Sequence, residues 1–162
     1  MHPLDSYTAT SGRLVPVYRI TINTRPDDAA RLLDAVHAVH PLDVGQYRRN
    51  ATLTAPGAET GRPGAQTVTR LHQDDFPADG TENYPSVELK IAIERDVAVL
   101  QRVMDAILDA HQYEEPTVHV REEWASRAAY STDNTNPNRW WNDGRGTPGM
   151  VPFGESNVPP RP

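Results

Sequence analysis

The sequence predicts an α+β domain in which two similar halves each supply a strand, a helix and a further strand. Three observations support this fold class. Polar and apolar residues alternate in the second half of residues 14–23 and again over residues 87–93, as they do in a strand with one buried face. Apolar residues spaced three and four apart follow each of these segments, which is typical of an amphipathic helix. A proline, Pro41 or Pro116, then ends each helical pattern and favours extended chain.

The first half begins with the strand over residues 14–23, whose polar side includes Arg19 and Thr21. Thr24 occupies the position of a helix N-cap, and Pro26 follows just inside the helix. Acidic residues come next, in the first turn, where the helix dipole favours negative charge. Five apolar residues then mark the buried face of this helix: Ala29, Leu32, Leu33, Val36 and Val39.

The middle of the chain is predicted to be mostly connections. Residues 44–53 are the next extended candidate, with a turn or bulge at Gly45. Glycine and proline over residues 55–65 predict a loop, and residues 72–83 read as an exposed acidic excursion. Between these two segments, residues 66–71 alternate weakly and are a candidate strand.

The second half repeats the order of the first. The strand over residues 87–93 is followed by Asp96, a plausible N-cap, and by a helix whose apolar stripe ends at His111. Pro116 stops the helix, and a short strand is expected over residues 117–120. The order strand, helix, strand, strand, helix, strand is that of the ferredoxin-like βαββαβ topology.

The corner after the second helix also resembles known proteins. His111-x-Tyr113-Glu114-x-Pro116 is similar to a segment shared by CutA proteins and by the PII-like domain inserted in YqfO-type proteins, which are relatives of the NGG1-interacting factor. The resemblance to the YqfO-type insert is the closer of the two.

Two upstream segments resemble the same insert. Gly45-Gln46-Tyr47 resembles its Gly-x-Tyr sequence, and the glycine-rich residues 57–64 resemble a loop that ends in Arg-Pro, here Arg62-Pro63. The resemblance covers about residues 15–120. It implies a ferredoxin-like PII/CutA-like domain that assembles as a homotrimer, with the sheets packed around a three-fold axis and clefts between the subunits.

The composition disfavours several functional classes. A net charge of −6 disfavours binding to nucleic acid or to an anionic membrane through bulk charge. The absence of cysteine excludes a disulfide framework and a zinc–thiolate site. The apolar runs are too short for a membrane span, and the N-terminus lacks the pattern of a signal peptide, so we expect a cytoplasmic protein. The sequence identifies no cofactor.

Composition also divides the chain. A hydrophobic content of 37% and 15 prolines indicate that part of the length lies outside the packed domain. We expect a flexible N-terminal arm over residues 1–13, the domain over residues 14–123 and a tail rich in proline, asparagine and glycine over residues 124–162. The adjacent Trp140 and Trp141 predict that this tail is anchored on the domain or on a neighbouring subunit.

The densest polar chemistry lies in the corner after the second helix. If the protein is an enzyme, Glu114 and His111 are its candidate general acid and base. The alternative is structural: His111 would cap the helix, Tyr113 would pack under the sheet and Pro116 would fix the corner. In the CutA-like trimers that the sequence resembles, this segment helps to build the contact between subunits.

The clefts implied by the resemblance suggest five ligand-binding residues: Tyr47, Arg62, Glu88, Tyr113 and His119. The glycine-rich loop around Arg62 either cradles an anion with its backbone amides or serves only as a hairpin connection. No metal site is predicted, because His37 and His40, three residues apart on the first helix, lack an evident third ligand.

Three functional hypotheses follow. The first is a trimeric PII/CutA-like protein that binds a small molecule or an ion in clefts between subunits. The second is a small trimeric enzyme of specialised metabolism, and the third is a structural interaction module. An enclosed pocket sealed by the tryptophan tail would favour the enzyme, whereas a shallow cleft under a mobile loop would favour the binding protein.

Overall fold

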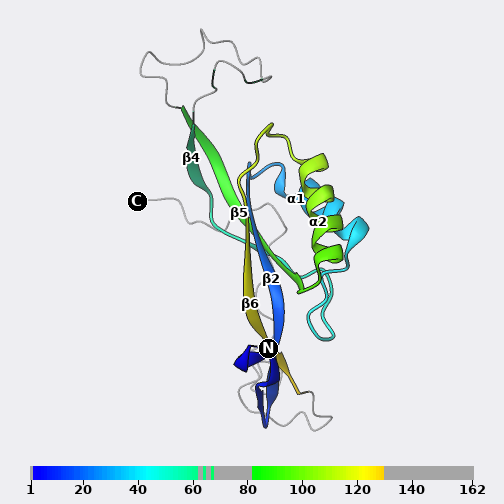
Figure 1. The fold of residues 1–162 in the computed structure, drawn as a ribbon. Coiled ribbons are helices and arrows are strands. Elements are labelled where there is room, and N and C mark those ends of the chain that lie inside the picture. Colours follow the sequence, from blue (N-terminus) through cyan, green and yellow to red (C-terminus); the bar gives the residue numbers. More distant parts are fainter. Residues whose placement is uncertain (1, 62–63, 65–66, 68–81, 130–162) are drawn as a thin grey trace, which may run out of the picture.

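The structure is a computed structural model of the chain, and it describes residues 2–61, 64, 67 and 82–129. Figure 1 shows one twisted antiparallel sheet with two helices packed on the same face. The elements, in chain order, are the 3-10 helix η1 (Pro3–Ser6), β1 (Thr8–Ala9), β2 (Gly12–Thr24), α1 (Ala29–Val39), β3 (Thr52–Leu53), β4 (Gly57–Gly61), β5 (Glu82–Glu94), α2 (Val97–Ala110) and β6 (Val118–Ala128).

The sheet is built around β2, which pairs with β5 on one side and with β6 on the other. β3 and β4 pair with the far edge of β5, so the order across the sheet is β6, β2, β5 and then β3 with β4. All of these pairings are antiparallel. Because α1 connects β2 to β3 and α2 connects β5 to β6, the topology is ferredoxin-like βαββαβ, and the predicted fold class is confirmed.

The core lies between the sheet and the two helices. The alternation predicted for the two long strands is confirmed where they face the helices, since Ile20 and Ile22 of β2 and Leu89, Ile91 and Ile93 of β5 are buried in the core. Of the five apolar residues predicted for the face of α1, four are buried, whereas Val39 at the helix end is 41% exposed. The largest buried side chains are Ile20, Ile22, Leu32, Leu42, Leu89, Ile91, Ile93 and Ile107.

The first helix begins later than predicted. Thr24 is the last residue of β2 and not an N-cap, and α1 starts at Ala29. Asp28 precedes the helix without capping it, because its carboxylate accepts two hydrogen bonds from Arg31 at 2.7 and 2.9 Å. The predicted N-cap of the second helix is confirmed, since Asp96 accepts hydrogen bonds from two backbone N–H groups in the first turn of α2.

A strand occupies part of the loop predicted over residues 55–65. β4 pairs along its whole length with residues 82–86 of β5, so pairing with a distant strand outweighs the local turn preference. The extended segment predicted over residues 44–53 is correspondingly short. Only β3 is a strand there, while Val44 and Tyr47 close a tight turn with two backbone hydrogen bonds.

Pairs of strands extend past the helices at both ends of the sheet. β4 and the first half of β5 form one ribbon, and the first half of β2 and the second half of β6 form the other (Figure 1). Helices cover only one face of the sheet, so the opposite face, called the open face below, carries no helix in the described part of the chain.

Residues near the N-terminus, expected to form a flexible arm, pack against the β2–β6 ribbon. Asp5 of η1 accepts a hydrogen bond from the Trp124 indole at 3.0 Å, and His2 stacks on the same indole with ring centroids 4.0 Å apart. This hydrogen bond, aided by Arg95, holds the pKa of Asp5 below its usual value. Trp124 thus holds the N-terminal residues against the ribbon. The predicted anchor at Trp140 and Trp141 lies outside the described residues.

Candidate functional site

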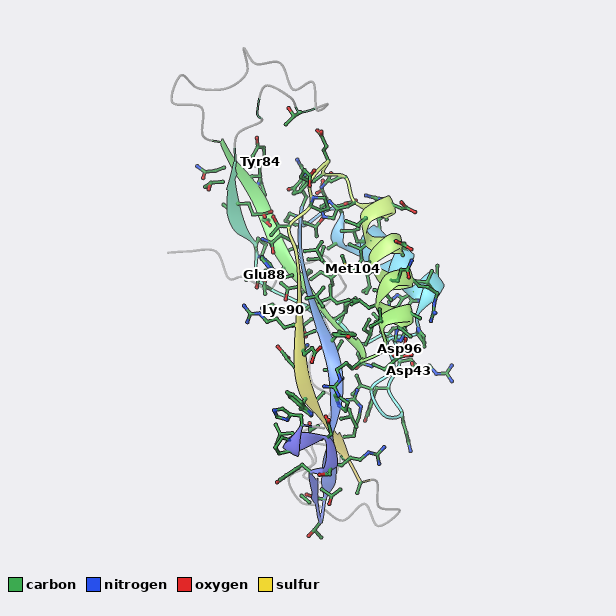
Figure 2. The ribbon with its side chains drawn as sticks, in the orientation of Figure 1. Asp43, Tyr84, Glu88, Lys90, Asp96 and Met104 are labelled. Atoms are coloured by element: carbon green, nitrogen blue, oxygen red, sulfur yellow. The ribbon has the colours of Figure 1, made fainter. Side chains whose placement is uncertain are left out.

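The open face of the sheet carries a groove. Cross-strand pairing places His119, Thr21 and Lys90 in one row across β6, β2 and β5. In Figure 2, Glu88 and Lys90 lie on this side of the sheet, whereas Met104 lies on the side of the helices. The groove has a volume of about 290 Å³. It is lined by Arg19, Thr21, Glu88, Lys90, His119, Arg121 and Glu123.

Two ion pairs neutralise most of the charge in the groove. The Arg19 guanidinium lies 3.3 Å from the Glu123 carboxylate, and the Lys90 ammonium lies 2.8 Å from the Glu88 carboxylate. All four side chains are between a third and a half exposed, so each pair contributes little to folding stability. These two pairs determine which charged side chain of the groove is left without a partner.

The charge that remains is on β6. Within the described part of the chain, no hydrogen bond or ion pair engages the side chains of Arg121 or His119. Arg121 also lies directly opposite Arg19 on the neighbouring strand. Like charges in directly opposed positions destabilise an antiparallel pair, and Glu123 compensates only Arg19. The groove therefore keeps one uncompensated guanidinium.

The corner after α2 is held together by His111. The Nε2 atom of its ring lies 3.0 Å from the Asn23 carbonyl oxygen, and its Nδ1 atom accepts a hydrogen bond from the Tyr113 backbone N–H at 3.0 Å. The ring therefore carries its proton on Nε2, and both nitrogens bind backbone. In this arrangement His111 ties the end of α2 to the end of β2, which is the structural role considered for it.

Asn23 links this corner to β4. Its side-chain amide donates a hydrogen bond to one carboxylate oxygen of Glu59 at 2.9 Å, and the Ser86 hydroxyl donates to the other at 2.7 Å. Glu59 thus bridges β4, β5 and β2 across the open face. The corner and the base of the β4–β5 ribbon form one hydrogen-bonded unit.

Tyr113 packs against the same unit. Its hydroxyl is buried and has no hydrogen-bond partner among the described residues. Burial raises the pKa of Tyr113, the charge of Glu59 adds to the increase, and the charge of Arg25 opposes it. A protonated phenol at this position fits a packing role better than an ionised one.

The structure separates the predicted site residues into different places. Glu88 and His119 line the same groove, while Tyr113 lies with His111 and the exposed Glu114 at the corner, near the end of β2. Tyr47 is 61% exposed on the turn after α1 and does not line the groove. Arg62 lies outside the described residues.

Three cationic residues of the groove were absent from the prediction: Arg19, Lys90 and Arg121. The alternation of residues 14–23 had already placed Arg19 on the polar side of its strand. Arg121 was missed because the last strand was predicted to end at residue 120, whereas β6 continues to Ala128. A longer final strand was the signal needed to find it.

Of the two histidines considered as metal ligands, His37 lies in α1 and His40 is its C-cap residue. The Nε2 atom of His40 lies 2.8 Å from the Glu94 carboxylate, and its Nδ1 atom accepts a hydrogen bond from the Leu42 N–H. Both ring nitrogens of His37 are buried without a partner among the described residues, and burial, together with the charge of Arg49, lowers the pKa of His37. The described chain contains no cluster of three or more such side chains placed to hold a metal ion.

Comparison with known proteins bears on the fold. No family profile and no curated protein matches the sequence. Among solved structures, the chain is similar to a NIF3-related protein from Bacillus cereus, with a TM-score of 0.54 and 15% sequence identity, over 73% of this chain and 28% of that one. The chain thus spans less than a third of the NIF3-related protein.

Two smaller proteins are also similar. The divalent ion tolerance protein CutA1 from Ehrlichia chaffeensis has a TM-score of 0.47 and 12% identity, over 83% of this chain and 96% of that one. The GlnK–ATP complex from B. subtilis has a TM-score of 0.41 and 13% identity, over 67% of this chain and 82% of that one. Likeness at this level does not argue for a shared function.

The sheet order, the two helices on one face and the similarity to the NIF3-related structure agree with the resemblance seen in the sequence. The chain has a PII/CutA-like, ferredoxin-like fold.

Proposed function

We propose that the protein is a homotrimeric PII/CutA-like binding protein that holds a small molecule or an ion between its subunits, at the groove on the open face. The observation that carries this proposal is the groove itself. Arg121 and His119, both without a partner among the described residues, lie beside Thr21 at a space of about 290 Å³. A concave site with a few convergent polar groups is the usual form of a small-molecule site.

The trimer is supported by what one subunit leaves uncovered. β6 pairs only with β2 among the described strands, so its outer edge presents free backbone groups along eleven residues. Exposed strand edges invite pairing with another chain, and no described helix covers the open face. Three sheets packed around a three-fold axis would cover both surfaces and place each groove next to a neighbouring subunit.

The five predicted ligand residues have different roles in this proposal. Glu88 and His119 contact the ligand directly. Tyr47 and Tyr113 do not line the groove and would contribute only where a neighbouring subunit brings them to one.

The partners proposed are therefore two further copies of the chain and a small ligand. No helix in the described residues is long and apolar enough to span a membrane. The cytoplasmic location and the lack of a nucleic-acid partner stay predictions from the sequence.

The two other hypotheses have less support. An enzyme that uses His111 as a base is not favoured, because backbone groups engage both nitrogens of its ring. A structural interaction module would form the trimer but leave the groove empty.

Native mass spectrometry of the full chain, purified without added metal, tests the proposal. We expect a mass three times that of the chain, with retained ligand mass that His119→Ala reduces. Arg102→Gln, on the exposed side of α2, is the matched control and should retain ligand like the wild type. A monomer mass at micromolar concentration refutes the trimer. An unoccupied trimer that binds nothing in a metabolite screen refutes the binding function and supports the structural module.

A further inference from the structure

We propose that the open-face groove recognises its ligand through an oxyanion, a phosphate or a carboxylate, bound by Arg121, His119 and Thr21. This assignment rests on the proposed function, because it names the ligand class of the same groove. It follows from the charge, the register and the free donors of the groove.

The charge balance of the groove differs from that of the chain. The chain carries a net charge of −6, yet the groove is lined by three cationic side chains and two carboxylates. Both carboxylates already have a cationic partner, Glu123 in Arg19 and Glu88 in Lys90. The charge left for a ligand to neutralise is the positive charge of Arg121.

The register explains why this charge requires an anion. Arg19 and Arg121 face each other on adjacent antiparallel strands, where opposed like charges are unfavourable. Because Glu123 already pairs with Arg19, an anion seated at this position would gain its main attraction from Arg121 and relieve the repulsion between the two guanidinium groups. A cation at the same position would add to the repulsion, so the pairing selects the sign of the ligand.

The free donors match the shape of an oxyanion. His119 and Arg121 lie two residues apart on β6, so their side chains point to the same face, and Thr21 lies directly opposite His119 on β2. The planar guanidinium of Arg121 can donate two parallel hydrogen bonds to a carboxylate or phosphate. The Thr21 hydroxyl and the His119 ring supply further donors from the neighbouring row.

One other occupant fits this chemistry. A glutamate or aspartate of a second subunit could pair with Arg121 and serve only to hold the trimer. In that case, loss of Arg121 would weaken assembly, and small anions would not bind in the groove of the wild type.

The test is a titration of the isotopically labelled full chain with pyrophosphate, with citrate and with uncharged glycerol, followed by backbone amide NMR. We expect pyrophosphate, citrate or both to shift the amides of Thr21, His119 and Arg121, and glycerol to shift none of them. Pyrophosphate alone would assign a phosphate ligand, and citrate alone a carboxylate ligand. Arg121→Gln should raise the Kd at least about tenfold, since it removes a charge-assisted contact. Arg102→Gln removes the same charge from α2 and should leave the Kd unchanged.

Several results would refute the oxyanion assignment, and each can be distinguished from failure of the proposed function. If neither anion shifts the groove amides while native mass spectra still show a trimer with retained ligand, the function stands and the oxyanion assignment falls. An equal loss of affinity in Arg121→Gln and Arg102→Gln would show nonspecific attraction. Dissociation of the trimer by Arg121→Gln, without groove shifts in the wild type, would assign Arg121 to the subunit contact. Anion binding to a monomer would support the assignment and refute the trimer.

Discussion

Replacing His111 tests whether the corner after α2 is structural. In His111→Ala, the Asn23 carbonyl and the Tyr113 N–H both lose a partner at 3.0 Å. A neutral hydrogen bond contributes about 0.5–1.5 kcal/mol, so the two together stabilise the fold by about 2 kcal/mol. For a domain of this size, that loss should lower the Tm by on the order of 8 °C.

Two further variants make the result specific. His111→Gln keeps an N–H donor for Asn23 but offers no equivalent acceptor for Tyr113, so its Tm should fall about half as far. In protein freed of ligand, His119→Ala removes an exposed imidazole that has no partner among the described residues, and it should melt like the wild type.

Thermal unfolding followed by circular dichroism, at one fixed protein concentration, measures all three variants, because the stability of an oligomer depends on concentration. If His111→Ala melts like His119→Ala, then the two hydrogen bonds do not hold the corner, and the structural role of His111 is refuted. A large loss of ligand binding without a change in Tm would instead return His111 to the functional site.

Three other substitutions have defined outcomes. Asp96→Ala removes the N-cap of α2 and should destabilise the domain by about 1 kcal/mol in urea unfolding, and an unchanged midpoint would contradict the capping role. Tyr113→Phe removes a buried hydroxyl without a described partner and should not destabilise the domain at neutral pH. Because burial raises the pKa of Tyr113, the unfolded chain ionises first, so its stabilising contribution is present below pH 10.0 and is lost as the pH rises through the folded-state pKa. The urea midpoint of Tyr113→Phe should therefore fall less above pH 10.0 than that of the wild type, and parallel curves would show that the phenol is not shifted. Gly12→Ala would place a Cβ 2.6 Å from the Arg127 carbonyl oxygen, so we expect faster amide exchange at the end of the β2–β6 ribbon, and unchanged exchange would show that the backbone yields freely.

The parts of the fold that follow a local pattern could be predicted from the sequence. The alternation in β2 and β5 and most of the apolar stripes of α1 and α2 depend only on burial against one neighbouring layer, and the structure confirms them. The exceptions are Val39 of α1 and Val97 and Leu108 of α2, which are exposed. β4 could not be predicted in the same way, because its residues favour turns and it becomes a strand only by pairing with β5. The contact of Trp124 with Asp5 likewise joins residues that are distant in the sequence, so no local pattern predicts it.

The groove depends both on a local sequence pattern and on the pairing of strands that are distant in the sequence. Ile20 and Ile22 must face the helices, so Arg19 and Thr21 face the open side, and this much follows from the alternation of one strand. That Arg121 stands opposite Arg19 follows only from the register of β6 on β2, which turns Val118 toward the helices. A slip of one residue would exchange the two faces of β6, turning His119 and Arg121 toward the helices and Val118, which packs against the core, toward the open face. The hydrophobic core therefore selects the register, and the register in turn assembles the charged row of the groove. For this reason, a substitution that shifts β6, such as Val118→Lys, should abolish anion binding in the groove even though Val118 does not line it.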